Sequence, residues 1–206
     1  MNKKFNRVVL IIFTFYSFNI FISCVGDPEI LDMDYDTIAL NGVDNSGEYL
    51  LYNSNTDIMY SEAVAIKLIL SDTSDGYSLL NNVKDLFSFQ KANATSLPDP
   101  YYLPVNSVES IAIYTLLDIN ETILAGDQVN SNIYYVFKND GNHLYNDADP
   151  IDYFNSKEYY LSRSVVLILN TAVDNDAAQF RIDVTFEDGT VFSETTNLFT
   201  IIPSEI

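Results

Sequence analysis

The fold follows from the stretch Phe180-Arg181-Ile182-Asp183-Val184-Thr185-Phe186-Glu187-Asp188-Gly189. Apolar and polar side chains alternate over its first seven residues, which predicts a β-strand with one face in a hydrophobic core. The Asp-Gly pair then marks a tight turn, because the central positions of such turns need a positive φ. Residues 190–202 return to β-type sequence, so the whole segment predicts a β-hairpin with its tip at Asp188-Gly189.

Other strand-like runs precede this hairpin. In residues 64–70 the apolar side chains again recur at every second position, and the turn-forming residues 71–76 follow them. Residues 108–117 and the shorter run 133–137 are also rich in β-branched and aromatic side chains. Residues 164–169 are almost wholly apolar, which predicts a central strand that is buried on both faces.

These runs predict one all-β domain over residues 36–206, an immunoglobulin-like or other Greek-key β-sandwich of about seven to nine strands. We expect residues 164–169 and 180–186 to be paired or neighbouring strands in its core. One or two short helical excursions are expected, at residues 77–87 and at residues 151–159, where the second follows Pro150. The proline-rich residues 97–104 predict an extended connection.

The first 23 residues predict a lipoprotein signal peptide. Lys3, Lys4 and Arg7 form a basic region, and the apolar run 8–22 leads to Ser23 and to Cys24, the single cysteine of the chain. That run is short for a membrane span, which needs roughly 20 apolar residues, and it has the length of a signal peptide. We expect cleavage before Cys24 and acylation of its thiol with diacylglycerol and palmitate-type chains. The alternative is an ordinary buried cysteine in a leader that is not cleaved there.

The chain is strongly acidic. It has 29 acidic and 10 basic residues and a net charge of −19, and removal of the three basic residues of the signal peptide takes this charge to −22. Such a charge disfavours binding to nucleic acid and to anionic lipid headgroups. Residues 24–35 predict an acidic tether between the anchor and the domain. The acidity favours solubility, and a site for a divalent cation is the alternative.

No enzyme class finds support in the sequence. His143 is the only histidine, and no G-x-S-x-G nucleophile elbow is present. With a single histidine and no free thiol, a zinc site is also unfavourable. We therefore expect a protein that is not an enzyme, although a hydrolase that uses only carboxylates stays open.

Calcium is the only metal ion or cofactor that the sequence suggests. The oxygen-bearing side chains of Asp140, Asn142, Asp147 and Asp149 lie in one loop, and Ca²⁺ prefers such ligands. Residues 174–176, Asp-Asn-Asp, form a second candidate. The alternative for both is a polar turn whose side chains cap their own backbone.

Tyrosine is abundant, with 15 tyrosines, 13 phenylalanines and no tryptophan. Three adjacent pairs, Tyr101-Tyr102, Tyr134-Tyr135 and Tyr159-Tyr160, would each place one ring inward and one outward if they lay in strands. Outward tyrosines would suit a sugar ring or a protein partner, although they are also good strand formers. Asp36-Thr37-Ile38 resembles the acceptor of O-glycans on exported Bacteroidota proteins.

The whole layout resembles the uncharacterised lipoproteins of this size found in Bacteroidota, and residues 108–115 and 180–189 carry most of the resemblance. It implies no catalytic residue. We expect an envelope lipoprotein anchored in the outer membrane, on its periplasmic or its surface face, with a β-sandwich that binds or scaffolds an envelope protein or a glycan. The alternatives are a glycan-binding accessory lipoprotein of a nutrient-uptake system and a fimbrial or adhesin subunit.

Overall fold

The computed structural model describes residues 28–46, 54–73, 100–138, 144–145 and 149–203. The chain divides into two compact units, and the second of them, residues 32–74 and 102–206, contains the β-sandwich. The predicted signal peptide, Cys24, the predicted helix 77–87 and His143 lie outside the described residues.

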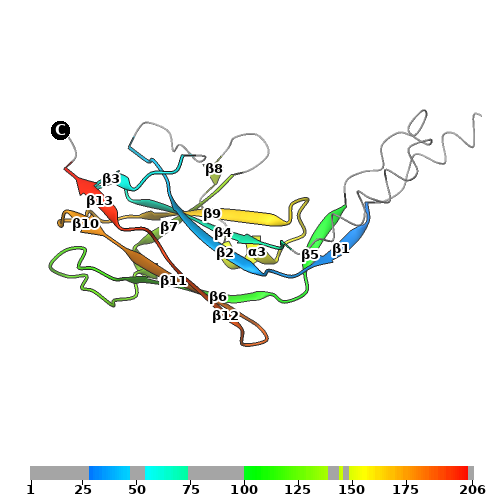
Figure 1. Cartoon of the computed structure of the whole chain (residues 1–206). Helices are drawn as coiled ribbons and strands as arrows, with labels where there is room; N and C mark the ends of the chain where they lie inside the picture. The colour runs from blue at the N-terminus through cyan, green and yellow to red at the C-terminus, as the bar shows by residue number, and fades with distance from the viewer. Residues whose placement is uncertain (1–27, 47–53, 74–99, 139–143, 146–148, 204–206) are drawn as a thin grey trace, which may run out of the picture. The chain divides into compact units, whose positions relative to one another are not determined.

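Eight of the described strands form two sheets that face each other (Figure 1). All neighbouring strands within these sheets are antiparallel. The first sheet has the order β2 (Thr37–Gly42), β4 (Ala65–Ser71), β9 (Ser162–Leu169) and β7 (Ile133–Lys138), with β8 (Leu144–Tyr145) added beside β7. The second sheet has the order β12 (Val191–Thr195), β11 (Phe180–Phe186) and β6 (Val108–Thr115).

The strand order is that of an immunoglobulin constant domain. Counted along the chain without the two-residue strand β8, the seven longer strands lie in the order 1-2-5-4 in the first sheet and 7-6-3 in the second, which corresponds to ABED and GFC. The prediction of an all-β, immunoglobulin-like Greek-key sandwich is therefore confirmed. Antibody domains add a disulfide and a buried tryptophan, whereas this chain has one cysteine and no tryptophan. Its two sheets are held together by other side chains.

The predicted alternation of β11 builds the core from the second sheet. Phe180, Ile182, Val184 and Phe186 are each at most 1% exposed, while the residues between them face outward. The first sheet contributes Leu68 and its neighbours on β4.

Strand β9 is buried on both faces, as predicted. Val165, Val166 and Leu167 are all fully buried, and Val166 belongs to a second apolar cluster on the other side of the sheet, with Val43 and Ala65. The expectation that this strand would pair with or neighbour β11 is wrong. Each sheet needs its own central strand, and β9 pairs with β4 and β7 while β11 pairs with β12 and β6.

The predicted hairpin joins β11 to β12. The amide of Gly189 donates to the carbonyl of Phe186 at 2.9 Å, and the amide of Phe186 donates to the carbonyl of Thr190 at 2.9 Å. Three residues therefore form the loop, and Gly189 takes a φ of +86°. A turn closed by a left-handed residue is a common three-residue hairpin loop.

Shorter elements lie around the two sheets. A third sheet has β13 in its centre, antiparallel to β10 and parallel to β3. Another pair, β1 with β5, forms a two-stranded sheet, and Met33 and Tyr35 at the end of the expected tether are buried. The bounds are β1 (Ile30–Met33), β3 (Ile58–Tyr60), β5 (Tyr101–Pro104), the 3-10 helix η2 (Asn130–Asn132), α3 (Pro150–Asn155), β10 (Ala177–Ala178) and β13 (Phe199–Ile202).

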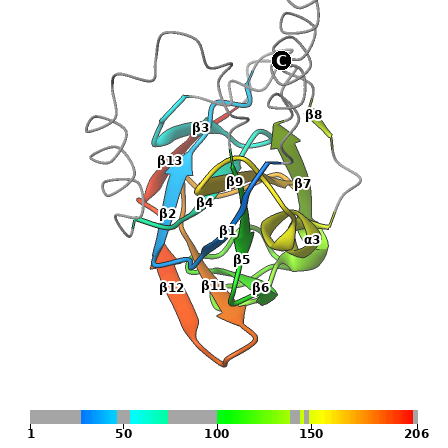
Figure 2. The ribbon, with the colours of Figure 1, turned by 90° about the vertical axis from the view of Figure 1, so that its right-hand side faces the viewer.

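Helix α3 confirms the expected excursion after Pro150, but it ends earlier, at Asn155. Seen along the strands, β2 and β12 lie on one side of the sandwich and α3 lies on the other (Figure 2). The ring of Tyr153 in α3 lies 5.0 Å from the ring of Phe137 in β7, and Asn155 hydrogen-bonds to Val108 in β6. The helix thus links one edge of each sheet.

Candidate functional site

A buried arginine lies at the end of the sandwich where α3 packs. Arg163 follows the period-two pattern of β9 into the core and is 1% exposed. Its Nη1 donates to the carbonyl oxygens of Phe154 and of Ser156, the latter at 2.7 Å, and its Nη2 donates to that of Tyr102 at 3.0 Å. Because the last carbonyls of a helix have no partner within it, the guanidinium caps α3 and ties it to β5.

Tyr35 completes this arrangement. Its hydroxyl donates to the carbonyl of Phe154 at 2.7 Å, and its ring centre lies 5.9 Å from the guanidinium carbon of Arg163. Burial raises the pKa of Tyr35 far above its usual value, against the opposing effect of the positive Arg163. Tyr35 is therefore a neutral donor at all physiological pH values. These contacts are internal, so the cluster stabilises the fold rather than presenting a site.

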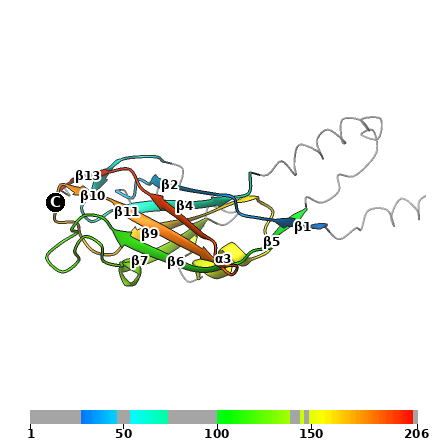
Figure 3. The ribbon, with the colours of Figure 1, turned by 60° about the horizontal axis from the view of Figure 1, so that its bottom comes forward.

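Polar side chains lie instead on the outer side of the sheet formed by β6, β11 and β12. Figure 3 shows the ribbon of these three strands. We call the residues Tyr114, Arg181, Asp183 and Ser193 the three-strand face. The strand register places Arg181 opposite Tyr114 and Asp183 opposite Ser193. Tyr114 comes from β6, and the other three residues come from the two strands of the β11–β12 hairpin.

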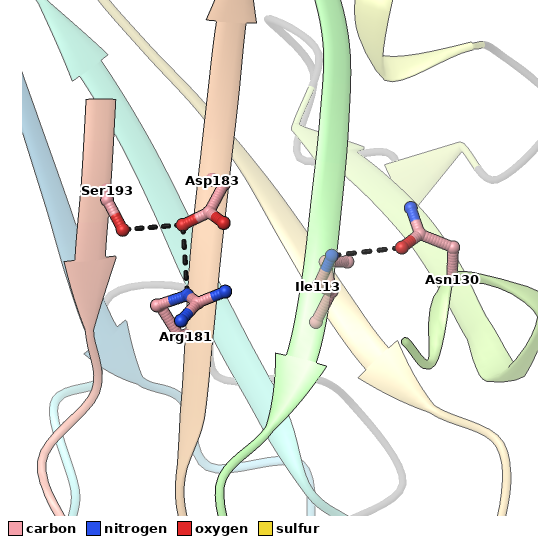
Figure 4. A network of polar contacts seen from close by, with 5 residues as sticks. All are labelled: Ile113, Asn130, Arg181, Asp183 and Ser193. Carbon is pink, nitrogen blue, oxygen red and sulfur yellow. Dashed lines mark hydrogen bonds and ion pairs between the residues drawn. The ribbon is translucent and has the colours of Figure 1, made fainter. Parts of the chain in front are cut away.

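Polar contacts order the three-strand face (Figure 4). The Nε of Arg181 lies 3.2 Å from Oδ1 of Asp183, and the hydroxyl of Ser193 donates to the same oxygen. The guanidinium carbon of Arg181 lies 4.8 Å from the centre of the Tyr114 ring, within the range of a cation–π contact. The side chains of Arg181 and Asp183 remain 43% and 22% exposed. The arginine is thus held in place while it stays accessible to a partner.

The free edge of β6 is closed by two asparagine side chains. Asn130 accepts from the amide of Ile113 at 2.9 Å and donates to the carbonyl of Ile111 at 2.7 Å (Figure 4). Asn155 accepts from the amide of Val108 at 2.7 Å and donates to its carbonyl at 2.9 Å. Each amide group takes the place of a neighbouring strand, so β6 does not offer these groups to another chain.

Only one of the four predicted calcium ligands lies in the described residues. Asp149 is the N-cap of α3, where its Oδ1 accepts from the amide of Ile151 at 2.8 Å, as in the polar-turn alternative. Asp140, Asn142 and Asp147 lie outside the described residues. Within the described part of the chain, no three acidic, histidine or cysteine side chains are grouped as metal ligands would be.

The second calcium candidate, residues 174–176, forms hydrogen bonds with the loop at residues 118–119. The side-chain Nδ2 of Asn175 donates to the carbonyl of Asp118 at 2.6 Å, and the backbone amide of Asp174 donates to the carbonyl of Ile119 at 2.8 Å. Residues 174–176 therefore connect two loops through hydrogen bonds.

The Asp36-Thr37-Ile38 motif lies at the start of β2. Both carboxylate oxygens of Asp36 accept hydrogen bonds from Thr73, which lowers the pKa of Asp36. Thr37 is exposed, and its hydroxyl lies 3.3 Å from the carbonyl of Ser71.

The tyrosine pairs behave as predicted only within strands. Tyr102 is 5% exposed and Tyr101 is half-buried, whereas Tyr134 is 57% exposed and Tyr135 is half-buried. Tyr159 and Tyr160 lie in an irregular connection rather than in a strand, and both are exposed, by 43% and 62%. The expectation of one inward and one outward ring was made for strands, so it does not apply to this last pair.

No family model matches the chain, and no curated protein matches it. One similar solved structure is a DUF4466 family protein from Parabacteroides merdae, a member of the Bacteroidota, and its family has no established function. The two chains share 6% identity with a TM-score of 0.36, and the match covers 81% of this chain but only 45% of the other.

No helix within the described residues combines the length and the apolar character needed to cross a membrane.

Proposed function

We propose that this chain is an envelope lipoprotein, acylated at Cys24, whose β-sandwich binds or scaffolds a protein partner and is not an enzyme. The signal sequence and its cysteine support the anchor. The observation that carries the binding role is the three-strand face, where Arg181 and Tyr114 lie ordered and partly exposed. Arginine and tyrosine are enriched among the residues that dominate protein interfaces.

The closed edge of β6 favours binding through this face. Strand addition by a partner requires free backbone groups at a sheet edge. Asn130 and Asn155 already bind such groups of β6. A partner would therefore meet side chains, with the guanidinium of Arg181 as a natural contact for a carboxylate.

The anchor has a direct test. We expect the native host to incorporate labelled fatty acid into the wild-type chain and not into Cys24→Ala, because the thiol is the acceptor. Labelled protein should be recovered with membranes, and the variant should be recovered in the soluble fraction. A wild-type chain that takes up no label would disprove the lipoprotein assignment.

The three-strand face has a separate test. A photo-crosslinking residue in place of Ser193 should give one discrete adduct in cells of the native host, and the same residue in place of Tyr134 should not, because Tyr134 is exposed on β7, in the other sheet. Adding Arg181→Ala should remove most of the Ser193 adduct, because a truncated interface arginine commonly costs about 2 kcal/mol of binding. Equal crosslinking from Ser193 and Tyr134, or a Ser193 adduct that is unchanged by Arg181→Ala, would contradict the assignment of this face.

A further inference from the structure

We infer that the sandwich rests on the surface of the bilayer through a patch formed by Leu103, Val105 and Tyr160. These side chains are 40%, 59% and 62% exposed. The inference rests on the proposed acylation of Cys24, and it adds the orientation that the anchored domain takes. The occupant of the patch is the interface of a zwitterionic lipid bilayer.

The three side chains gather around one short β-bridge. Tyr102 and Glu158 pair as antiparallel partners, with backbone hydrogen bonds of 2.6 and 3.1 Å, and all three patch residues lie within three positions of this pair. In β5 and just beyond it, Tyr102 and Pro104 point inward and are buried, so Leu103 and Val105 point away from the core. The alternation that builds β5 thus forces two apolar side chains into solvent.

The reach of the tether places this patch at the anchored end. The amide of Val105 donates to the carbonyl of Met33 at 2.9 Å, and Met33 follows Cys24 by nine residues. Even a fully extended chain of that length spans only about 30 Å. The opposite end of β6 carries the loop with Leu124, one eight-residue strand or about 26 Å further away. The anchored chain therefore enters the sandwich beside Val105, one strand length away from Leu124.

Charge and chemistry select the kind of surface. The chain is strongly acidic, and Asp32 and Asp34 near Met33 are exposed, so anionic headgroups would repel this end. Tyrosine has an apolar ring and a polar hydroxyl, which suits the boundary between acyl chains and headgroups. A neutral, zwitterionic surface can accept Leu103, Val105 and Tyr160 without that repulsion.

The chain contains no tryptophan, so one introduced tryptophan reports on a single position. We would purify acylated Tyr160→Trp and the matched control Leu124→Trp, which replaces a side chain 52% exposed at the other end. Each would be reconstituted in vesicles of phosphatidylethanolamine and phosphatidylcholine, with or without brominated acyl chains. We expect a blue shift and strong quenching for Tyr160→Trp, neither for Leu124→Trp, and weaker quenching when Leu103→Ser and Val105→Ser are added to Tyr160→Trp.

Each other outcome has a definite meaning. If labelled fatty acid is incorporated but Tyr160→Trp is not quenched, or both variants are quenched alike, the orientation is wrong and the anchor stands. If no fatty acid is incorporated, both proposals fall. If Tyr160→Trp is already blue-shifted on the Cys24→Ala background without vesicles, another part of the chain covers the patch, and the inference is overturned.

Discussion

Replacing Arg163 with methionine is expected to lower the free energy of unfolding by about 2–4 kcal/mol, although methionine is apolar and has a similar length. The guanidinium binds the carbonyls of Phe154, Ser156 and Tyr102 at once. Phe154 would keep the hydroxyl of Tyr35 as a donor, and Tyr102 would keep the amide of Glu158. The carbonyl of Ser156 would lose its bond to Arg163, and the last turn of α3 would lose its cap. The substitution also removes a buried positive charge and its desolvation cost, which offsets part of this loss of stability.

The midpoint of denaturant unfolding measures this change, with every variant made on the Cys24→Ala background. Arg163→Lys is the matched control, because it keeps the charge but lacks the planar fork that reaches several carbonyls. We expect Arg163→Lys to be destabilised as well. An unchanged midpoint in Arg163→Met, or full stability in Arg163→Lys, would show that the carbonyl contacts contribute little.

Replacing Gly42 with alanine is expected to destabilise the domain by about 3 kcal/mol, the upper end of the range for overpacked cores. A Cβ at this position would lie 2.0 Å from the carbonyl oxygen of Thr56, 2.7 Å from Cε of Met59 and 2.9 Å from Cε1 of Phe199. The Thr56 carbonyl belongs to backbone that is itself pinned, because the amide of Thr56 donates to the carbonyl of Gly42 at 3.1 Å. Part of the chain between β2 and β3 must therefore move.

Gly189→Ala is the control for that substitution. Gly189 has a φ of +86°, but no heavy atom lies within 4 Å of the position of its Cβ. Its expected cost is about 1 kcal/mol, from the left-handed backbone alone. Thermal or denaturant unfolding compares the two variants. Equal losses of stability would mean that steric contact is not the main cause of the destabilisation by Gly42→Ala.

The features predicted from sequence are those with a local cause. The hairpin at Asp188-Gly189 follows from alternation and a turn pair, and the burial of β9 on both faces follows from an unbroken apolar run. Neither pattern specifies which strand lies beside which. The pairing of β9 with β4 and β7 depends on loop connections and on packing between distant segments, so the expected proximity of residues 164–169 to 180–186 was wrong.

The polar residues that organise the structure were harder to find. Arg163 carries a usable signal, because it shares its phase in β9 with Val165 and Leu167 and so must point inward. Asn130 and Asn155 have no such signal in the sequence. An asparagine whose side chain binds the backbone of a strand has the same local sequence as an asparagine in a solvated turn. Part of the three-strand face could be predicted, because the alternation in residues 180–186 places Arg181 and Asp183 on the outward side. Their contacts with Tyr114 and Ser193 depend on the register of β11 with β6 and β12, which the sequence does not specify.

The parallel pairing of β3 with β13 has a consequence for when the fold can form. Thr200 lies opposite Ile58 in the register, so this contact joins segments that are 142 positions apart. Contacts between such distant segments form slowly, because a long loop must close before any stabilisation is gained. With β13 in the middle of its sheet, neither β3 nor β10 has a neighbour there until residues 199–202 arrive. Strands β3 and β10 would therefore stay unpaired in this sheet while the segments that precede β13 are being made.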